Sequence, residues 1–180
     1  MPNYRRARDG NTYFFTLVTY QRQPILCLEA CRKILREVIK ETRLLYPFKI
    51  EAWVLLPDHL HCIWRLPDGD VNYSMRWGLI KKEFTKRIKN LVGVAHPTKS
   101  RERHREGTIW QRRFWEHRIR DEKDFAVHCD YIHYNPVKHG LVKSSKDWVY
   151  STFHRYVKAG VYLMEWGMSE INFTEDIGGE

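Results

Sequence analysis

The chain has 180 residues, of which 43% are hydrophobic and 14% aromatic, enough for the core of one folded domain and too many for a globally disordered chain. Residues 1–158 hold all 31 Lys and Arg against 17 acids, and this net charge of +14 predicts a polyanionic partner, most simply nucleic acid. No apolar stretch reaches the roughly 18 residues of a membrane span, and the N-terminus has no apolar run of signal-peptide type. The four cysteines form no CxxC pair. We therefore expect a cytoplasmic, nucleoid-associated protein without membrane contact.

The first half of the chain predicts strands around one helix. Residues 12–20 are rich in aromatic and β-branched side chains, which is typical of a buried strand. Residues 28–46 have apolar side chains at helical spacing and stop before Pro47. Residues 48–56 and 59–66 are two short apolar runs separated only by Pro57 and Asp58, which predicts a tight β-hairpin.

The second half predicts another helix, a strand and further helices. Residues 74–91 carry an apolar stripe on one face of a helix and three lysines on the opposite face. We expect a basic loop over residues 93–107, a strand in the C-terminal half of residues 108–120, and a helix capped by Asp121 or Asp124. This helix should end at Asn135-Pro136, because the residue before proline disfavours helical geometry. A short helix follows near residues 151–158.

This order predicts an α+β fold with a ferredoxin-like or RRM-like split β-α-β antiparallel sheet and an added C-terminal helical region. We expect helices packed on one face of the sheet and the other face free to bind a ligand. One domain should cover residues 1–158, and residues 159–180 should form an acidic tail. This topology serves many functions, so the fold alone decides little.

Two histidines begin the second strand of the predicted hairpin. Because residues two apart in a strand project to the same face, His59 and His61 would stand side by side and could share a metal ion, while Leu60 points into the core. The alternative is a pair of histidines that are merely solvated or hydrogen-bonded.

A second pair of candidates lies at the end of the late helix. Tyr131 and Asn135 are four residues apart and so share a helix face. The amide oxygen is an acceptable ligand for Mg²⁺ or Mn²⁺, and the phenol is a possible nucleophile toward phosphate. The alternative is that Tyr131 and Tyr134 pack as ordinary aromatics and that Asn135 caps the helix.

The segments Pro57–Trp64 and Asp130–Val142 resemble the two signature segments of the single-tyrosine HUH transposases, most closely the branch called REP-associated tyrosine transposases, where REP denotes a repetitive extragenic palindrome. The segments Trp110–His117 and Trp148–His154 are also similar to that branch. The resemblance extends over nearly the whole chain and weakens over the acidic tail.

The resemblance implies an enzyme that cuts and rejoins single-stranded DNA at or near hairpins through a covalent 5′-phosphotyrosine. By position, His59 and His61 correspond to the HUH pair, Tyr131 to the nucleophile and Asn135 to the third ligand of Mg²⁺ or Mn²⁺. More distant insertion-sequence members have Gln at the position of Asn135. The expected partners are single-stranded DNA and DNA hairpins, bound by a monomer or a homodimer.

The basic and aromatic side chains supply candidates for DNA contacts. Basic side chains would neutralise phosphates and aromatic rings would stack on unpaired bases, unless they belong to solvated helix faces or to the core. The candidates are Arg5, Arg6, Lys82, Lys86, Lys89, Arg101, Arg103, Arg105, Trp110, Arg112, Arg113, Phe114, Trp115 and Arg118.

Two rival functions and one regulatory hypothesis remain at this point. The chain could be a nucleic-acid-binding module of the same fold without catalysis, or a metal-dependent hydrolase that activates water with Tyr131 as a bystander. The acidic tail could dock on the cationic DNA groove through Tyr162, Trp166 or Phe173 and compete with DNA, or it could simply pack at the edge of the domain.

Overall fold

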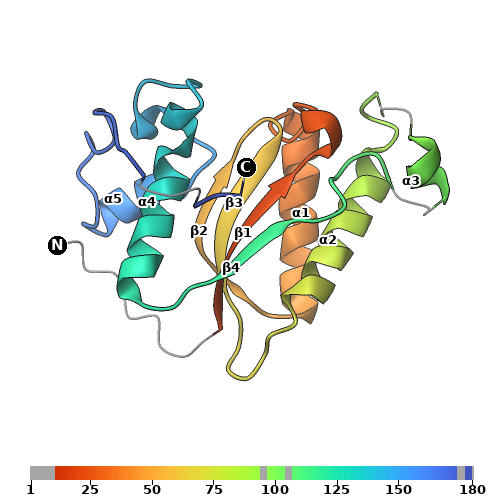
Figure 1. The fold of residues 1–180 in the computed structure, drawn as a ribbon, viewed down its shortest axis with the longest axis horizontal. Helices are drawn as coiled ribbons and strands as arrows, with labels where there is room; N and C mark the ends of the chain where they lie inside the picture. Colours follow the sequence, from red (N-terminus) through yellow and green to blue (C-terminus); the bar gives the residue numbers. More distant parts are fainter. Residues whose placement is uncertain (1–10, 94–96, 104–106, 174–176, 180) are drawn as a thin grey trace.

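A four-stranded antiparallel sheet forms the centre of the computed structural model, which describes residues 11–93, 97–103, 107–173 and 177–179 (Figure 1). The strand order is β2-β3-β1-β4, the order of a split β-α-β fold, which confirms the expected fold class. The strands are β1 (Thr12–Val18), β2 (Lys49–Leu55), β3 (His59–Arg65) and β4 (Trp115–Arg118).

The described helices lie between and after these strands in the expected order. A short helix, α3, occupies part of the segment expected to be an irregular basic loop. Two 3₁₀ turns, η1 (Tyr20–Arg22) and η2 (Ser145–Asp147), complete the set. The helices are α1 (Glu29–Leu45), α2 (Tyr73–Ile88), α3 (Lys99–Arg103), α4 (Glu122–Lys138) and α5 (Phe153–Lys158).

Helices cover both faces of the sheet, so the expectation of one free face is wrong. α1 and α2 pack on one face, where Trp64 of β3 stacks on Trp77 of α2 at a centroid distance of 3.9 Å. α4 covers the opposite face, where Phe14, Ile63 and Ile132 share a second core (Figure 1). The sequence of β1 explains why both faces are covered, because all seven of its residues are apolar, aromatic or threonine and all are buried.

α4 continues to Lys138, past the predicted end at Asn135-Pro136. Asp121 caps its N-terminus as expected, with its side chain accepting a hydrogen bond from the backbone N–H of Asp124. Pro136 removes only its own donor, and the helix continues until Gly140 adopts φ +67° and the N–H of Leu141 bonds the carbonyl of Pro136. The extension places Lys138 on the same helix as Tyr131.

None of the described helices is long and apolar enough to cross a membrane.

Candidate active site and nucleic-acid interface

His59 and His61 lie side by side on the face of β3 that α4 covers, as their spacing predicts. Their side chains are 1% and 0% exposed, and their ring centroids are 5.0 Å apart. Nδ1 of His59 lies 2.7 Å from Oδ1 of Asp58, and Nδ1 of His61 lies 2.8 Å from Oγ1 of Thr16. Since Nδ1 of each ring is engaged, Nε2 is the atom that a metal would take, the usual arrangement of a metal-binding histidine with an orienting partner.

Asp58 is an acidic partner held in its charged form. Burial raises its pKa, but the hydrogen bond from His59 and the nearby Arg22 guanidinium outweigh burial and lower the pKa to about 2. Nη1 of Arg22 lies 3.0 Å from Oδ2 of Asp58. The carboxylate therefore stays ionised at neutral pH and fixes the orientation of the His59 ring.

One face of α4 brings the tyrosine and the asparagine to these histidines. The Tyr131 ring lies 5.2 Å from the His61 ring, and the His139 ring lies 4.9 Å from the His59 ring. Asn135 is fully buried and lies on the same helix face halfway between positions 131 and 139. The structure thus gathers His59, His61, Tyr131 and Asn135 in one place.

The chemistry of this donor set fits a divalent cation. Two imidazole nitrogens and one amide oxygen leave coordination positions for water or phosphate oxygens, as an exchangeable catalytic metal requires. The same composition differs from the thiolate-rich sets of structural zinc sites.

Lys138 is a component of the site that the sequence analysis did not include. Its Nζ donates a hydrogen bond of 3.0 Å to the hydroxyl of Tyr131 and lies 4.7 Å from the centre of that ring. The spacing of seven residues, two helical turns, was the available signal, but the predicted helix ended before position 138. The ammonium lies where negative charge would develop on an attacking or leaving phenolate oxygen.

The C-terminal segment covers the tyrosine. The hydroxyl of Thr16 donates a hydrogen bond of 2.5 Å to the carbonyl of Gly178, and the Phe173 ring lies 5.4 Å from the Tyr131 ring. Only glycine fits at position 178, because a Cβ there would collide with the Tyr131 hydroxyl. Phe173 and Gly178 of the acidic tail therefore lie at Tyr131, a place different from the cationic groove that was one of the two positions expected for the tail.

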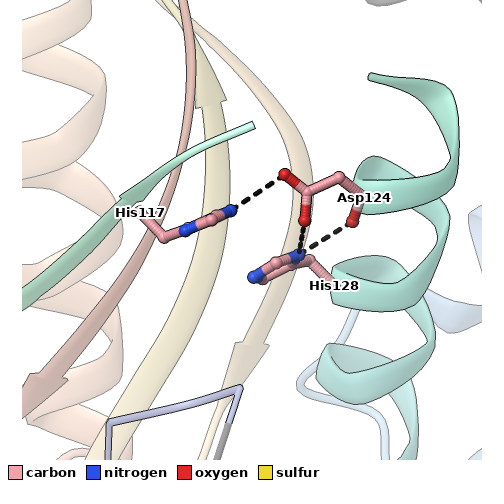
Figure 2. A group of neighbouring side chains, drawn as sticks. All are labelled: His117, Asp124 and His128. Carbon is pink, nitrogen blue, oxygen red and sulfur yellow. Dashed lines mark hydrogen bonds and ion pairs between the residues drawn. The ribbon is translucent and has the colours of Figure 1, made fainter. Parts of the chain in front are cut away.

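A second polar cluster joins β4 to the start of α4. Figure 2 shows His117 of β4 and His128 of α4 next to each other, both joined to Asp124. Oδ2 of Asp124 lies 2.9 Å from Nε2 of His117 and 3.0 Å from Nε of Arg120, and its Oδ1 lies 3.3 Å from Nδ1 of His128. Burial raises the pKa of Asp124, but the hydrogen bonds from Arg120 and His117 outweigh it and lower the pKa.

The three side chains of this cluster offer ligand atoms within 4.8 Å of one another, but their arrangement suits a clamp better than a metal site. The two imidazole rings are stacked at 4.6 Å with an interplanar angle of 12°, so their in-plane lone pairs do not converge on one point. Burial lowers the pKa of His128, which favours its neutral form beside the carbonyl of Asp124. Asp124 and His128 are four residues apart on α4, a spacing that the sequence analysis did not use, and His117 lies seven residues before Asp124 on a different element.

Part of the predicted DNA-binding set lines one groove, which we call the α2 groove. It has a volume of about 490 Å³ and runs between α2 and the segment 107–112. At the edge of this groove, the guanidinium of Arg101 lies 3.9 Å from the centre of the Tyr20 ring. The predicted residues in its lining are Lys82, Lys86, Lys89, Arg101, Trp110 and Arg112.

The aromatic members of the predicted DNA-binding set differ in exposure. Trp110 is only 6% exposed and packs against Phe84, and Phe114 is half-buried against the core, so both contribute to packing and their stacking on bases stays a prediction. Trp115 is 48% exposed, and Gly179 lies against part of its ring. Arg103, Arg113 and Arg118 are exposed outside the α2 groove, and Arg5, Arg6 and Arg105 lie outside the described residues.

Comparison with known proteins assigns the class to which this fold and site belong. The family described as "Transposase IS200 like" matches residues 9–135. The match includes β1, the histidine pair and both Tyr131 and Asn135.

Two relatives and one solved structure narrow the class. The chain is 44% identical to the REP-associated tyrosine transposase of Escherichia coli K12 over 97% of this chain and 96% of the relative. A Haemophilus influenzae protein assigned to the same group is 46% identical over 93% of this chain and 94% of that protein. A solved structure of a REP-associated tyrosine transposase bound to a REP hairpin is 43% identical in sequence and superposes with a TM-score of 0.75. The match covers 97% of this chain and 96% of the chain in that structure. The chain therefore belongs to the REP-associated tyrosine transposases and is a single-tyrosine transposase.

Proposed function

We propose that the protein nicks and joins single-stranded DNA at hairpin-forming repetitive extragenic palindromes, with a divalent metal and a covalent 5′-phosphotyrosine intermediate. The observation that carries the proposal is the contact between the Tyr131 ring and the His61 ring in a site that also holds His59 and Asn135. A solved relative of 43% identity was captured with a REP hairpin, which supports the choice of substrate.

The metal-binding group in this proposal consists of His59, His61 and Asn135. A bound Mg²⁺ or Mn²⁺ would neutralise charge on the scissile phosphate. Asp58 and Thr16 hold the two imidazoles in the orientation that this role needs. The protein's own contribution is therefore a rigid, buried pair of nitrogen ligands beside the nucleophile.

The hydroxyl of Tyr131 carries out the exchange of ester bonds. Its oxygen forms a bond to phosphorus, the bond from phosphorus to the 3′ oxygen breaks, and the 3′ oxygen leaves as a hydroxyl with the proton that the phenol gives up. Lys138 stabilises the negative charge on the phenolic oxygen through its hydrogen bond. Attack by a DNA 3′-hydroxyl on the phosphotyrosine reverses these changes and joins a strand.

The DNA itself would be held by positive charge elsewhere on the domain. The lysines of α2 and Arg112 line the α2 groove, where they can neutralise the phosphates of a hairpin stem. Trp115, exposed on β4, is the aromatic side chain placed to stack on an unpaired base.

A covalent adduct assay separates this function from its rivals. A hairpin oligonucleotide with a labelled strand and Mn²⁺ or Mg²⁺ should give a protein-DNA adduct that survives a denaturing gel. A binding module without chemistry gives neither adduct nor nick, and a hydrolase that activates water gives a nick without an adduct. His61→Ala should abolish the adduct while the variant keeps its circular dichroism spectrum, and full activity in a chelator would exclude the metal.

A further inference from the structure

A second cationic groove lies on the opposite side of the sheet from the candidate active site. This α1 groove has a volume of about 540 Å³ and is lined by α1, by β2 and by the segment 149–155. The candidate active site lies on the other face, between β3 and α4 (Figure 1). A ligand shared by the two would therefore meet them with different parts.

The α1 groove is lined by five cations and, among the described residues, by no acid: Arg32, Arg36, Lys40, Arg43 and Arg155. The four on α1 are spaced by four, four and three residues, so they form one stripe with a cation about every 5 to 6 Å along the helix axis. No described residue forms an ion pair with any of the five. Arg43 and Arg155 donate to the carbonyls of Phe48 and Ile50, which leaves their charge uncompensated.

Aromatic surface accompanies this charge. Trp53 of β2 and Tyr150 are half-buried in the lining, and the Arg32 guanidinium lies 4.6 Å from the centre of the Tyr150 ring. Backbone bonds between Leu55 and Tyr150 and between Thr152 and Trp53 fix the two sides of the groove to each other. The groove is therefore preformed, with aromatic rings beside a row of cations.

We propose that the α1 groove binds single-stranded nucleic acid. A row of cations follows a phosphate backbone, and aromatic rings in the same groove stack on unpaired bases, a combination that fits a single strand better than a duplex or an acidic peptide. The inference rests on the proposed function in one respect, because an enzyme that exchanges DNA strands must hold a strand besides the one under attack. The α1 groove would hold that strand away from Tyr131.

The test measures binding of a fluorescein-labelled 20-nucleotide oligothymidylate, which forms no hairpin, to the full chain by fluorescence anisotropy. The variant Arg36→Gln/Lys40→Gln should bind it about tenfold more weakly at low salt, and the plot of log affinity against log salt should become shallower by about 1.4. The control variant Lys123→Gln/Lys143→Gln loses the same charge at exposed positions outside both grooves and should lose less than twofold.

Photo-crosslinking locates the strand directly. An oligonucleotide containing 5-iodouracil should crosslink to peptides that contain Trp53 or Tyr150. Crosslinks confined to the α2 groove, an equal loss in the control variant, or displacement of the strand by an equal concentration of polyglutamate would overturn the inference.

Hairpin cleavage separates failure of this inference from failure of the proposed function. Arg36→Gln/Lys40→Gln should cleave a minimal hairpin within twofold of the unsubstituted chain. Tyr131→Phe should lose cleavage and still bind the oligothymidylate in the α1 groove. A chain that cleaves hairpins but shows no α1-groove binding would refute the inference and leave the function intact.

Discussion

Lys138 donates a hydrogen bond to the hydroxyl of Tyr131 across two turns of α4, and this contact gives the proposed nucleophile a fixed cation. Nothing else about Lys138 marks it in the sequence, because its side chain is exposed and lies after a proline that was expected to end the helix. Its position matters only in three dimensions, where its ammonium lies beside the phenolic oxygen of Tyr131.

Replacing Lys138 with Met should therefore slow hairpin cleavage roughly 100-fold, the usual effect of removing one donor from a developing negative charge. Hairpin affinity should stay within a few-fold, since one exposed cation is lost. Single-turnover cleavage on a gel and anisotropy binding measure the two effects. Lys138→Arg, which keeps a donor and the charge, should retain more activity than Met, and a Met variant that cleaves within twofold of the original rate would contradict the role.

At the scale of elements, the clamp of His117, Asp124 and His128 joins β4 to the helix that carries Tyr131 (Figure 2). Asp124 accepts hydrogen bonds from the backbone and side chain of Arg120 as well as from His117. These bonds are charge-assisted and partly buried, so each contributes more than an exposed ion pair does.

Asp124→Asn should lower the free energy of unfolding by about 2 kcal/mol at neutral pH. Because the pKa of Asp124 is lowered in the folded protein, its contribution is complete above the unfolded pKa of about 3.9 and is lost as pH falls through the folded pKa. Urea titrations from pH 7 to pH 2.5 should show that the difference in free energy of unfolding between the two proteins becomes smaller as the pH falls. A difference in free energy of unfolding that stays constant with pH would show that the charge of Asp124 contributes nothing to stability.

The tail is the second element whose position has a direct consequence. Gly178 lies against the Tyr131 hydroxyl and Phe173 against its ring, so a DNA strand that reached this hydroxyl under the proposed function would have to displace them. Tyr162 and Trp166 stack on each other at 4.4 Å, and Tyr162 stacks on Phe153 of α5, so the first part of the tail is anchored in the domain.

Removal of residues 173–180 should therefore raise the rate of hairpin cleavage, most visibly at low salt, while the anchor of Tyr162 and Trp166 remains. The matched control is Phe173→Ala in the full chain, which should give a smaller increase because Gly178 still covers the hydroxyl. A truncated chain with an unchanged circular dichroism spectrum and an unchanged or slower rate would exclude competition by the tail.

At the scale of the whole molecule, the charge of the domain should dominate the affinity for DNA. The affinity for a hairpin should fall steeply with salt, and Lys82→Gln/Lys86→Gln should reduce the slope of log affinity against log salt by about 1.8, because each contact with a duplex phosphate contributes about 0.9. Anisotropy at several salt concentrations measures the slope, and a flat profile would refute an interface dominated by phosphate contacts.

The sequence was sufficient for the sheet and for the central site, because both depend on local patterns. Aromatic and β-branched residues place β1, two apolar runs around a short turn place the hairpin, and spacings of two and four place the histidine pair and the Tyr131-Asn135 pair on single faces. The second covered face, the burial of Trp110 and the clamp at Asp124 depend on which elements meet in space. Local periodicity carries no information about that: the position of α4 decides the covered face and the clamp, and packing against Phe84 of α2 decides the burial of Trp110.

The central claim is that the hydroxyl of Tyr131 is the nucleophile, and one comparison tests it most directly. The full chain and Tyr131→Phe are incubated with a labelled hairpin oligonucleotide and Mn²⁺, and both are resolved on a denaturing gel and analysed by mass spectrometry of the adduct. The account predicts a covalent adduct on the peptide containing Tyr131 in the full chain, and neither adduct nor nick in the Phe variant, whose hairpin affinity stays within a few-fold. Nicking by the Phe variant at the original rate, or an adduct on another residue, would contradict it.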